Sequence, residues 1–174
     1  MSKVLVTGGA GFIGSHTTIQ LINRGFDVCI ADSLVNSSEL VISQIQKVIK
    51  LNQHPNKGRL FFRKGDLRDK NYLHNLFNEF KGYESPYPPF DFVIHFAGLK
   101  SAEESVNEPL KYWNANLIGT LNLLEIMNFY KCYTLVFSSS AYIYEPNLIG
   151  KLRLLFVSTF YSLFNNKKIK KLSI

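Results

Sequence analysis

Several features are scarce in this chain of 174 residues, and each shortage excludes a class of protein. The two cysteines, Cys29 and Cys132, lack the spacing of a metal site or a disulfide framework, which favours buried free thiols in a reducing compartment and no bound metal. No apolar stretch reaches the roughly 18 residues of a membrane span. Glycines end the first apolar run, Val4–Val6, too early for a signal peptide. We therefore expect no transmembrane segment and a cytoplasmic location.

Acidic residues are missing from residues 151–174, and this explains most of the net charge of +7. That stretch carries six lysines and arginines, so residues 1–150 hold 14 basic against 13 acidic side chains. Because the net charge of residues 1–150 is so close to zero, we predict no nucleic-acid partner. With 46% hydrophobic and 19% charged residues, the composition is typical of a globular core.

Glycines at positions 8, 11 and 14 directly follow the apolar segment Val4–Thr7. This spacing permits a tight turn, a close approach of backbone N–H groups to a phosphate, and close packing of the next helix. That helix would present unpaired N–H groups and a positive dipole end to a pyrophosphate. An ordinary strand-to-helix turn is the alternative.

Asp32 closes the second apolar run, 18 residues after Gly14. A carboxylate about 20 residues beyond the glycines is typical of one that meets the adenosine ribose hydroxyls of a dinucleotide. Such a carboxylate could accept two hydroxyl hydrogen bonds and would repel a 2′-phosphate, which favours NAD over NADP. The alternative is an acidic turn residue after a strand.

Apolar and amphipathic segments alternate along residues 1–146, and the alternation predicts an α/β fold with a doubly wound parallel sheet in the strand order 3-2-1-4-5. The expected strands are residues 4–7, 28–31, 60–63, 92–96 and 135–137, and the expected helices are 13–24, 39–50, a segment through 73–80, and 117–130. One helix face is expected at Leu40, Val41, Gln44, Ile45, Val48 and Ile49, and another at Leu117, Leu121, Leu124 and Met127.

Small and polar residues follow all five predicted strands. They are Gly8–Gly14, Asp32, Gly65–Leu67, Ala97–Lys100 and Ser138–Ser140. The carboxyl ends of the strands in an open parallel sheet form one crevice, and ligands bind there. The sequence therefore predicts a single site at this edge.

At these residues the sequence resembles the extended short-chain dehydrogenase/reductase family, and within it the UDP-glucose 4-epimerases. The resemblance covers residues 1 to about 144. It is carried by residues 4–17, His95-Phe96-Ala97-Gly98-Leu99-Lys100, Glu104-Ser105-Val106, Pro109-Leu110, Asn116, Gly119-Thr120 and Val136–Ala141. It implies a Rossmann-type domain that binds NAD, a UDP-sugar substrate, and the interconversion of UDP-glucose and UDP-galactose through a transient 4-keto sugar in galactose metabolism.

The resemblance also assigns site residues. Ser140 matches the catalytic serine that hydrogen-bonds the reacting sugar oxygen; it could instead satisfy the backbone at a strand end. Lys100 could be a solvated surface lysine, and we interpret His95 as a hydrogen-bonded core histidine. The residues implied for the cofactor are Gly8, Gly11, Phe12, Ile13, Gly14, Asp32, Asn36, Asp66, Leu67, Phe96, Ala97, Gly98 and Lys100.

The chain departs from the family pattern in its catalytic base. The family uses a tyrosine whose pKa is lowered by a lysine four residues later, and none of the nine tyrosines here is followed by lysine at that spacing. Glu103 and Glu145 replace usual glycines, and we expect the sugar-binding half of the family to be missing. We expect a truncated epimerase-like protein, weakly active or inactive alone, and a homodimer if a full-length form exists. The alternative is a non-catalytic nucleotide-binding or interaction module.

Residues 147–174 form a tail of a different character, with an apolar segment, Leu152–Phe164, followed by a basic one. Three interpretations compete. The tail is a translated noncoding or frameshifted extension, an additional strand or helix on the core, or a short interfacial membrane helix.

Overall fold

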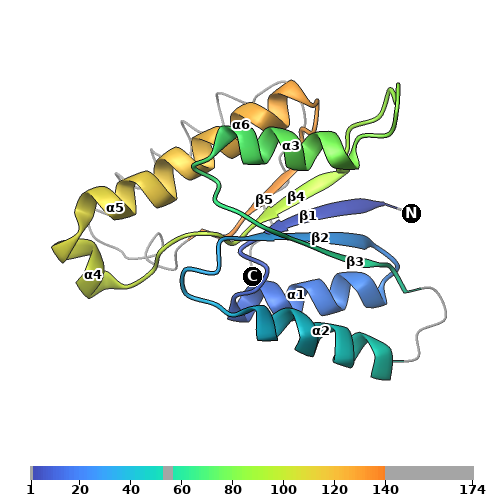
Figure 1. Cartoon of the computed structure of the whole chain (residues 1–174), viewed down its shortest axis with the longest axis horizontal. Helices are drawn as coiled ribbons and strands as arrows, with labels where there is room; N and C mark the ends of the chain where they lie inside the picture. The colour runs from blue at the N-terminus through green and yellow to red at the C-terminus, as the bar shows by residue number, and fades with distance from the viewer. Residues whose placement is uncertain (1, 53–56, 140–174) are drawn as a thin grey trace, which may run out of the picture.

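A parallel sheet of five strands forms the centre of the molecule (Figure 1). The computed structural model describes residues 2–52 and 57–139. The strands are β1 (Lys3–Thr7), β2 (Asp27–Asp32), β3 (Leu60–Lys64), β4 (Phe92–His95) and β5 (Leu135–Phe137), in the order β3-β2-β1-β4-β5. Central strand β1 places Val6 between Ile30 and Ile94. The predicted fold class and strand order are confirmed.

Helices cover both faces of this sheet, as Figure 1 shows. Helices α1 (Phe12–Asn23) and α2 (Glu39–Leu51) lie on one face, and α3 (Lys70–Phe80) and α6 (Gly119–Phe129) lie on the other. Polar side chains cap the amino ends of two of these helices. Ser38 accepts a hydrogen bond from the Leu40 N–H ahead of α2, and Asp69 accepts from the N–H groups of Asn71 and Tyr72 ahead of α3.

Successive side chains of each strand point to opposite faces of the sheet, and this divides the core into two layers. Val4, Val6 and Ile30 pack with the α1 and α2 side, while Leu5 and Val93 pack with the α3 and α6 side. Both cysteines are free and buried, as expected, and burial raises the pKa of each thiol to about 12.

Two of the predicted helix faces were partly wrong. In α2 the buried residues are Ile42, Ile45 and Ile49, whereas Leu40 is 69% exposed. In α6 the buried face follows Thr120, Leu123, Leu124 and Met127, and Leu121 is 43% exposed. Successive helical residues are about 100° apart. Because both helices are apolar on several sides, the sequence pattern could not select which side faces the sheet.

The single helix expected over residues 117–130 is the last part of a longer helical arm. Helix α4 (Ala102–Asn107) starts at Ser101, whose hydroxyl accepts from the Glu104 N–H, and α5 (Pro109–Trp113) starts with a proline in its first turn. A π-helical turn (Asn114–Ile118) then joins α5 to α6. The sequence pattern missed α4 and α5 because neither buries a residue, so no apolar periodicity marks them.

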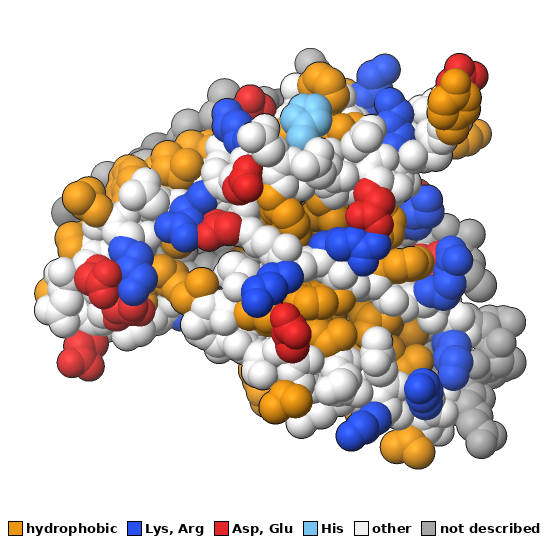
Figure 2. Space-filling model, viewed as in Figure 1, with side chains coloured by type: hydrophobic (Ala, Val, Ile, Leu, Met, Phe, Trp, Pro, Cys, Tyr) orange, Lys and Arg blue, Asp and Glu red, His pale blue; other side chains and the backbone are white. Residues whose placement is uncertain are grey.

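Hydrophobic side chains lie along the outside of this arm, where Figure 2 shows a series of orange groups at the upper left. The exposed large hydrophobic residues of the arm include Val106, Leu110, Trp113, Leu121 and Phe129. Among the described residues, no helix is long and apolar enough to span a membrane.

Candidate functional site

The turn between β1 and α1 requires glycine at two positions. Gly8 has a φ of 68°, and a Cβ added there would lie 2.6 Å from the backbone nitrogen of Ala97. A Cβ on Gly14 would lie 2.3 Å from the carbonyl oxygen of Gly8. Both contacts are with backbone, which cannot move aside as a flexible side chain would. These glycines therefore allow α1 to begin close against the sheet, beside the end of β4.

The amino end of α1 lacks a side-chain cap. Gly11 is the capping residue, and the first turn holds no acidic side chain. The Ser15 N–H is the first to bond within the helix, to the Gly11 carbonyl at 2.9 Å, so the N–H groups of residues 12–14 precede the helical ladder. A Cβ on Gly11 would meet only the Gly8 carbonyl oxygen, at 3.2 Å, which leaves an open concavity beside these donors. This arrangement suits an anion.

Asp32 at the end of β2 organises the adjacent loops. Its side chain is 8% exposed and accepts hydrogen bonds from the N–H of Ala10 (2.9 Å), the N–H of Leu34 (2.9 Å) and the hydroxyl of Ser37 (3.1 Å). Leu34 has a φ of 60°, a left-handed conformation that is uncommon for leucine. Asp32 thus connects the glycine turn to the loop after β2, a structural role that the sequence pattern did not reveal.

After β3, Asp66 pairs with Arg68. The carboxylate accepts from the Arg68 N–H (2.9 Å), from Nε (3.0 Å to each oxygen) and from Nη2 (2.5 Å). Hydrogen bonding to Arg68 lowers the pKa of Asp66 below its ordinary value, although partial burial opposes this. Leu67 between them is buried.

The segment after β4 is held by Asn116 in the π-helical turn. The Asn116 side chain accepts from the Leu99 N–H at 2.7 Å and donates to the Leu99 carbonyl at 2.9 Å. A Cβ on Gly98 would lie 3.3 Å from Asn116 Oδ1. Asn116 is one of the residues that carry the family resemblance, but the resemblance assigned it no role. Its position in a π-helical turn, which often marks a functional region, was not visible in the sequence.

His95 is a core histidine, as we expected. It is 2% exposed, and its two ring nitrogens contact the hydroxyls of Thr7 (2.5 Å) and Thr120 (2.9 Å). Burial lowers its pKa to about 4, with a smaller contribution from Lys100. A neutral histidine in this position joins β1, β4 and α6.

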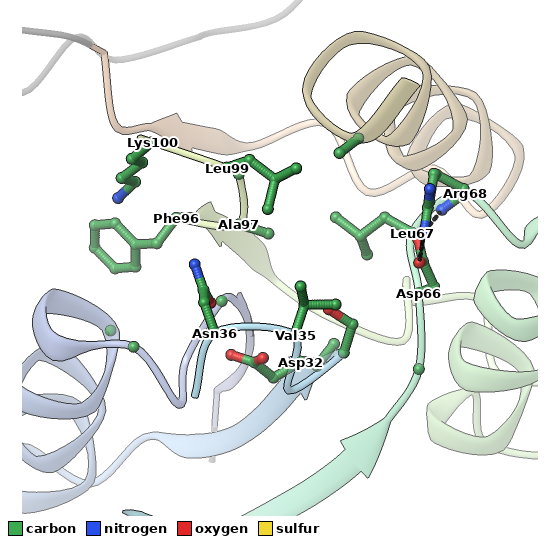
Figure 3. A pocket seen from close by; sticks show the side chains of 18 of the residues that line it. Asp32, Val35, Asn36, Asp66, Leu67, Arg68, Phe96, Ala97, Leu99 and Lys100 are labelled. Carbon is green, nitrogen blue, oxygen red and sulfur yellow. Dashed lines mark hydrogen bonds and ion pairs between the residues drawn. The ribbon is translucent and has the colours of Figure 1, made fainter. Parts of the chain in front are cut away.

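These strand ends surround one pocket of about 460 Å³, within the usual range of small-molecule sites. In Figure 3, Asp32, Val35 and Asn36 form one wall, Phe96, Ala97, Leu99 and Lys100 lie opposite, and Asp66, Leu67 and Arg68 form a third side. The structure brings all thirteen residues implied for the cofactor to this pocket. Gly65 and Leu99, which were expected at this edge as strand-end residues, also line the pocket. Lining residues that the sequence pattern did not select are Ala31, Ser33, Val35, Arg68, Lys111 and Ala115.

Two predictions concern residues outside the described part of the chain, namely the catalytic role of Ser140 and the character of the 147–174 tail. Within residues 2–52 and 57–139, no group of three His, Cys, Asp or Glu side chains could hold a metal ion.

Comparison with known proteins identifies the family of this chain. Residues 5–169 match the family model described as GDP-mannose 4,6 dehydratase. The chain belongs to this family. Among curated relatives in the family, it is 48% identical over 142 residues to a bifunctional UDP-glucose 4-epimerase and UDP-xylose 4-epimerase of Pisum sativum. It is 50% identical over 144 residues to UDP-glucose 4-epimerase 1 of Oryza sativa subsp. japonica.

These alignments cover 82% and 83% of this chain but 37% of each relative. The resemblance to the epimerases over the amino-terminal part is therefore confirmed, and the chain spans little more than a third of the relatives' length. The family match runs past residue 147, whereas the relatives align over shorter stretches, and the division into residues 1–146 and 147–174 stays a prediction.

Solved structures of family members agree. The UDP-glucose 4-epimerase of Stenotrophomonas maltophila, with bound NAD and formylated UDP-arabinopyranose, superposes with a TM-score of 0.76 at 32% identity. That superposition covers 94% of this chain and 48% of that enzyme. The Bifidobacterium longum epimerase in complex with NAD⁺ and UDP gives a TM-score of 0.75 at 32% identity, over 93% of this chain and 49% of that one.

Proposed function

We propose that this chain is the NAD-binding part of a UDP-glucose 4-epimerase. The observation that supports this most strongly is the convergence of thirteen expected residues, from the ends of four strands, on one pocket. Relatives about half identical over the same region are named as UDP-glucose 4-epimerases, and solved epimerases of the same fold contain NAD.

The residues of the pocket fit NAD. The uncapped amino end of α1 and the open concavity beside Gly11 suit the pyrophosphate. Asp32 lines the pocket and would accept from the adenosine ribose, and Phe96, Gly98 and Lys100 line it where the nicotinamide ribose and ring would lie. Asp66 and Leu67 would flank the adenine, and Asn36 would complete the adenosine side.

Bound NAD would supply a hydride acceptor at the 4-position of a UDP-sugar and then return the hydride to the opposite face. This chain's own residues would bind and orient: the α1 amino end holds the phosphates, Asp32 sets the adenosine half, and Ser140 hydrogen-bonds the reacting sugar oxygen. The chain offers no tyrosine followed by lysine four residues later, so it lacks the usual arrangement for removing the 4-hydroxyl proton.

The wider setting follows from the same proposal. We place the protein in galactose metabolism in the cytoplasm, with a UDP-sugar substrate, and as a homodimer if a full-length form exists. The missing Tyr-x-x-x-Lys pattern specifically favours a second candidate, a nucleotide-binding module without catalysis. The genomic sequence across codon 147 distinguishes the two, since an in-frame Tyr-x-x-x-Lys segment downstream would favour the epimerase.

Calorimetric titration of the purified chain with NAD and NADP tests the proposal. We expect one NAD site per chain and tighter binding of NAD than of NADP. Failure to bind NAD would contradict both candidate functions, because each takes this pocket to bind the dinucleotide.

A further inference from the structure

The segment between α3 and β4 projects from the body of the molecule, at the upper right of Figure 1. It runs from Lys81 to Pro89 and contains neither helix nor strand. Because β4 begins at the amino edge of the parallel sheet, this loop lies at the edge opposite the pocket, which the carboxyl ends of the strands surround. None of these described residues lines that pocket. The loop is therefore separate from the site described above.

Large side chains in this loop lie in solvent. Tyr83 is 95% exposed and Tyr87 is 75% exposed. Between them, Ser85 is half-buried and Pro86 is exposed. Figure 2 shows the projection standing clear of the surface at the upper right. An enzyme that modifies a side chain here could therefore reach it without unfolding the sheet.

Both ends of the loop are anchored in the body of the molecule. The Lys81 N–H donates to the carbonyls of Phe77 at 3.1 Å and Asn78 at 3.2 Å, which closes the end of α3. Phe90, directly after the loop, is fully buried, and its ring centroid lies 5.2 Å from that of Phe77 and 5.0 Å from that of Phe80. The middle of the loop can therefore change conformation without disturbing the core.

Ser85 lies in this middle part. Its N–H donates to the Gly82 carbonyl at 3.0 Å, and its side-chain oxygen accepts from the Tyr87 N–H at 3.3 Å, which is long for such a bond. The serine oxygen is an acceptor in this contact, so its own proton takes no part in it. A residue that precedes proline favours an extended backbone, which is the form in which kinases bind their substrates. The loop thus presents a serine hydroxyl in a conformation that suits transfer.

The dipeptide Ser85-Pro86 is the one place in the 174-residue sequence where proline follows serine or threonine. The residues that precede the other prolines are His54, Tyr87, Pro88, Glu108 and Glu145. Proline has no N–H, so an apolar pocket that accepts it disfavours other residues, which would bury an unpaired donor. Proline-directed kinases select their substrates by this difference. The fold places the one matching dipeptide on its projecting loop.

We propose that Ser85 is a phosphorylation site for a proline-directed serine/threonine kinase that uses ATP. The Ser85 oxygen attacks the γ-phosphorus of ATP, a new O–P bond forms, and the bond from that phosphorus to the β-phosphate oxygen breaks. ADP leaves, and the hydroxyl proton passes to the catalytic base of the kinase. The product adds nearly two negative charges at neutral pH to the edge of the sheet opposite the pocket. This inference does not depend on the proposed function.

The experiment incubates the full chain with a mitogen-activated protein kinase and MgATP. Intact mass and mapping of the modified peptide measure the incorporation. We expect one phosphate per chain, on Ser85, and none in Ser85→Ala. Pro86→Ala should slow incorporation by about tenfold or more, because alanine brings an unpaired N–H into the proline pocket of the kinase.

Ser43→Ala is the matched control. Ser43 is exposed, but it lies within α2 and is followed by glutamine, so its loss should leave incorporation unchanged. A synthetic peptide of residues 79–92 tests what the fold contributes. The folded chain should be phosphorylated with a kcat/KM within about threefold of that peptide, because opening of a surface loop costs little free energy. Thermal unfolding of each variant checks that it folds.

Phosphorylation of the peptide without phosphorylation of the folded chain would show that the fold hides Ser85, and would overturn the inference. Incorporation that persists in Ser85→Ala, or that is absent from both chain and peptide, would overturn it as well. Titration with NAD keeps the proposed function separate. The phosphorylated and unmodified chains should bind NAD equally, and failure of both to bind NAD would contradict the proposed function while leaving the phosphorylation result intact.

Discussion

Replacing Asp32 with asparagine should separate the structural and the binding roles of this carboxylate. Three protein groups already donate to it, namely the N–H groups of Ala10 and Leu34 and the hydroxyl of Ser37. Because a carboxylate has about four acceptor positions, one ribose hydroxyl can be added directly, and a second requires the Ser37 hydroxyl to turn away. In Asp32→Asn the amide NH₂ must face one of the two backbone donors, which then lacks an acceptor.

The structure gives a magnitude for each role. One buried backbone donor left unsatisfied lowers the free energy of unfolding by about 1–3 kcal/mol. A hydrogen bond from a ribose hydroxyl to a charged acceptor contributes about 1.5–3 kcal/mol, so NAD should bind roughly 10- to 100-fold more weakly. NADP should lose less, because the variant no longer repels its 2′-phosphate, and the NAD-to-NADP preference should therefore shrink.

Calorimetric titration of Asp32→Asn with both cofactors, together with urea unfolding, measures these effects. Asp27→Asn is the control, because Asp27 is a buried carboxylate at the opposite end of β2 that pairs with Arg59 outside this pocket. It should lower stability without changing the cofactor preference. Equal binding of NAD and NADP by the unmodified chain, or an unchanged preference in Asp32→Asn, would refute the reasoning.

Three further predictions concern the glycine turn, His95 and catalysis. Gly14→Ala should destabilise the fold, because its Cβ would lie 2.3 Å from a backbone oxygen. Gly11→Ala should fold normally and bind NAD more weakly. Unfolding curves and NAD titrations that show no difference between these two variants would count against the role of the turn. His95 has a pKa of about 4 when folded and near 6.5 when unfolded, so the unfolded chain takes up more protons between these values and stability falls as pH drops, by about 2–3 kcal/mol from pH 7 to 4.5. Urea unfolding should show a flatter pH dependence for His95→Gln than for the exposed-site control His16→Gln, and equal slopes would disprove the assignment. A polypeptide of these 174 residues should interconvert UDP-glucose and UDP-galactose slowly or not at all with added NAD, since loss of a general base removes on the order of 10²–10⁴ in rate, and turnover near one per second would contradict this.

The sheet could be predicted from the sequence because each strand is a short apolar run bounded by glycine, proline or polar residues. For the same reason β5 was predicted with its observed bounds, Leu135–Phe137. The pocket residues could be predicted because a parallel sheet brings its carboxyl ends together, whatever the packing of the helices.

The remaining features depend on tertiary contacts that no local pattern contains. The inward side of α2 is set by packing on α1 and the sheet, so Leu40 was placed wrongly. The Asn116 side chain contacts the distant backbone of Leu99, and the Arg68 side chain contacts the neighbouring carboxylate of Asp66. Neither single contact produces a periodic pattern in the sequence. Asp32 was selected for a ligand, yet its three protein hydrogen bonds became apparent only from the structure.

A crystal structure of the chain grown with NAD tests the central claim most directly. The account predicts NAD in the pocket at the carboxyl ends of β1 to β4, with the pyrophosphate at the amino end of α1, the adenine beside Asp66 and the nicotinamide towards Lys100. NAD bound elsewhere, or bound in the reverse direction with its adenine beside Lys100, would contradict it.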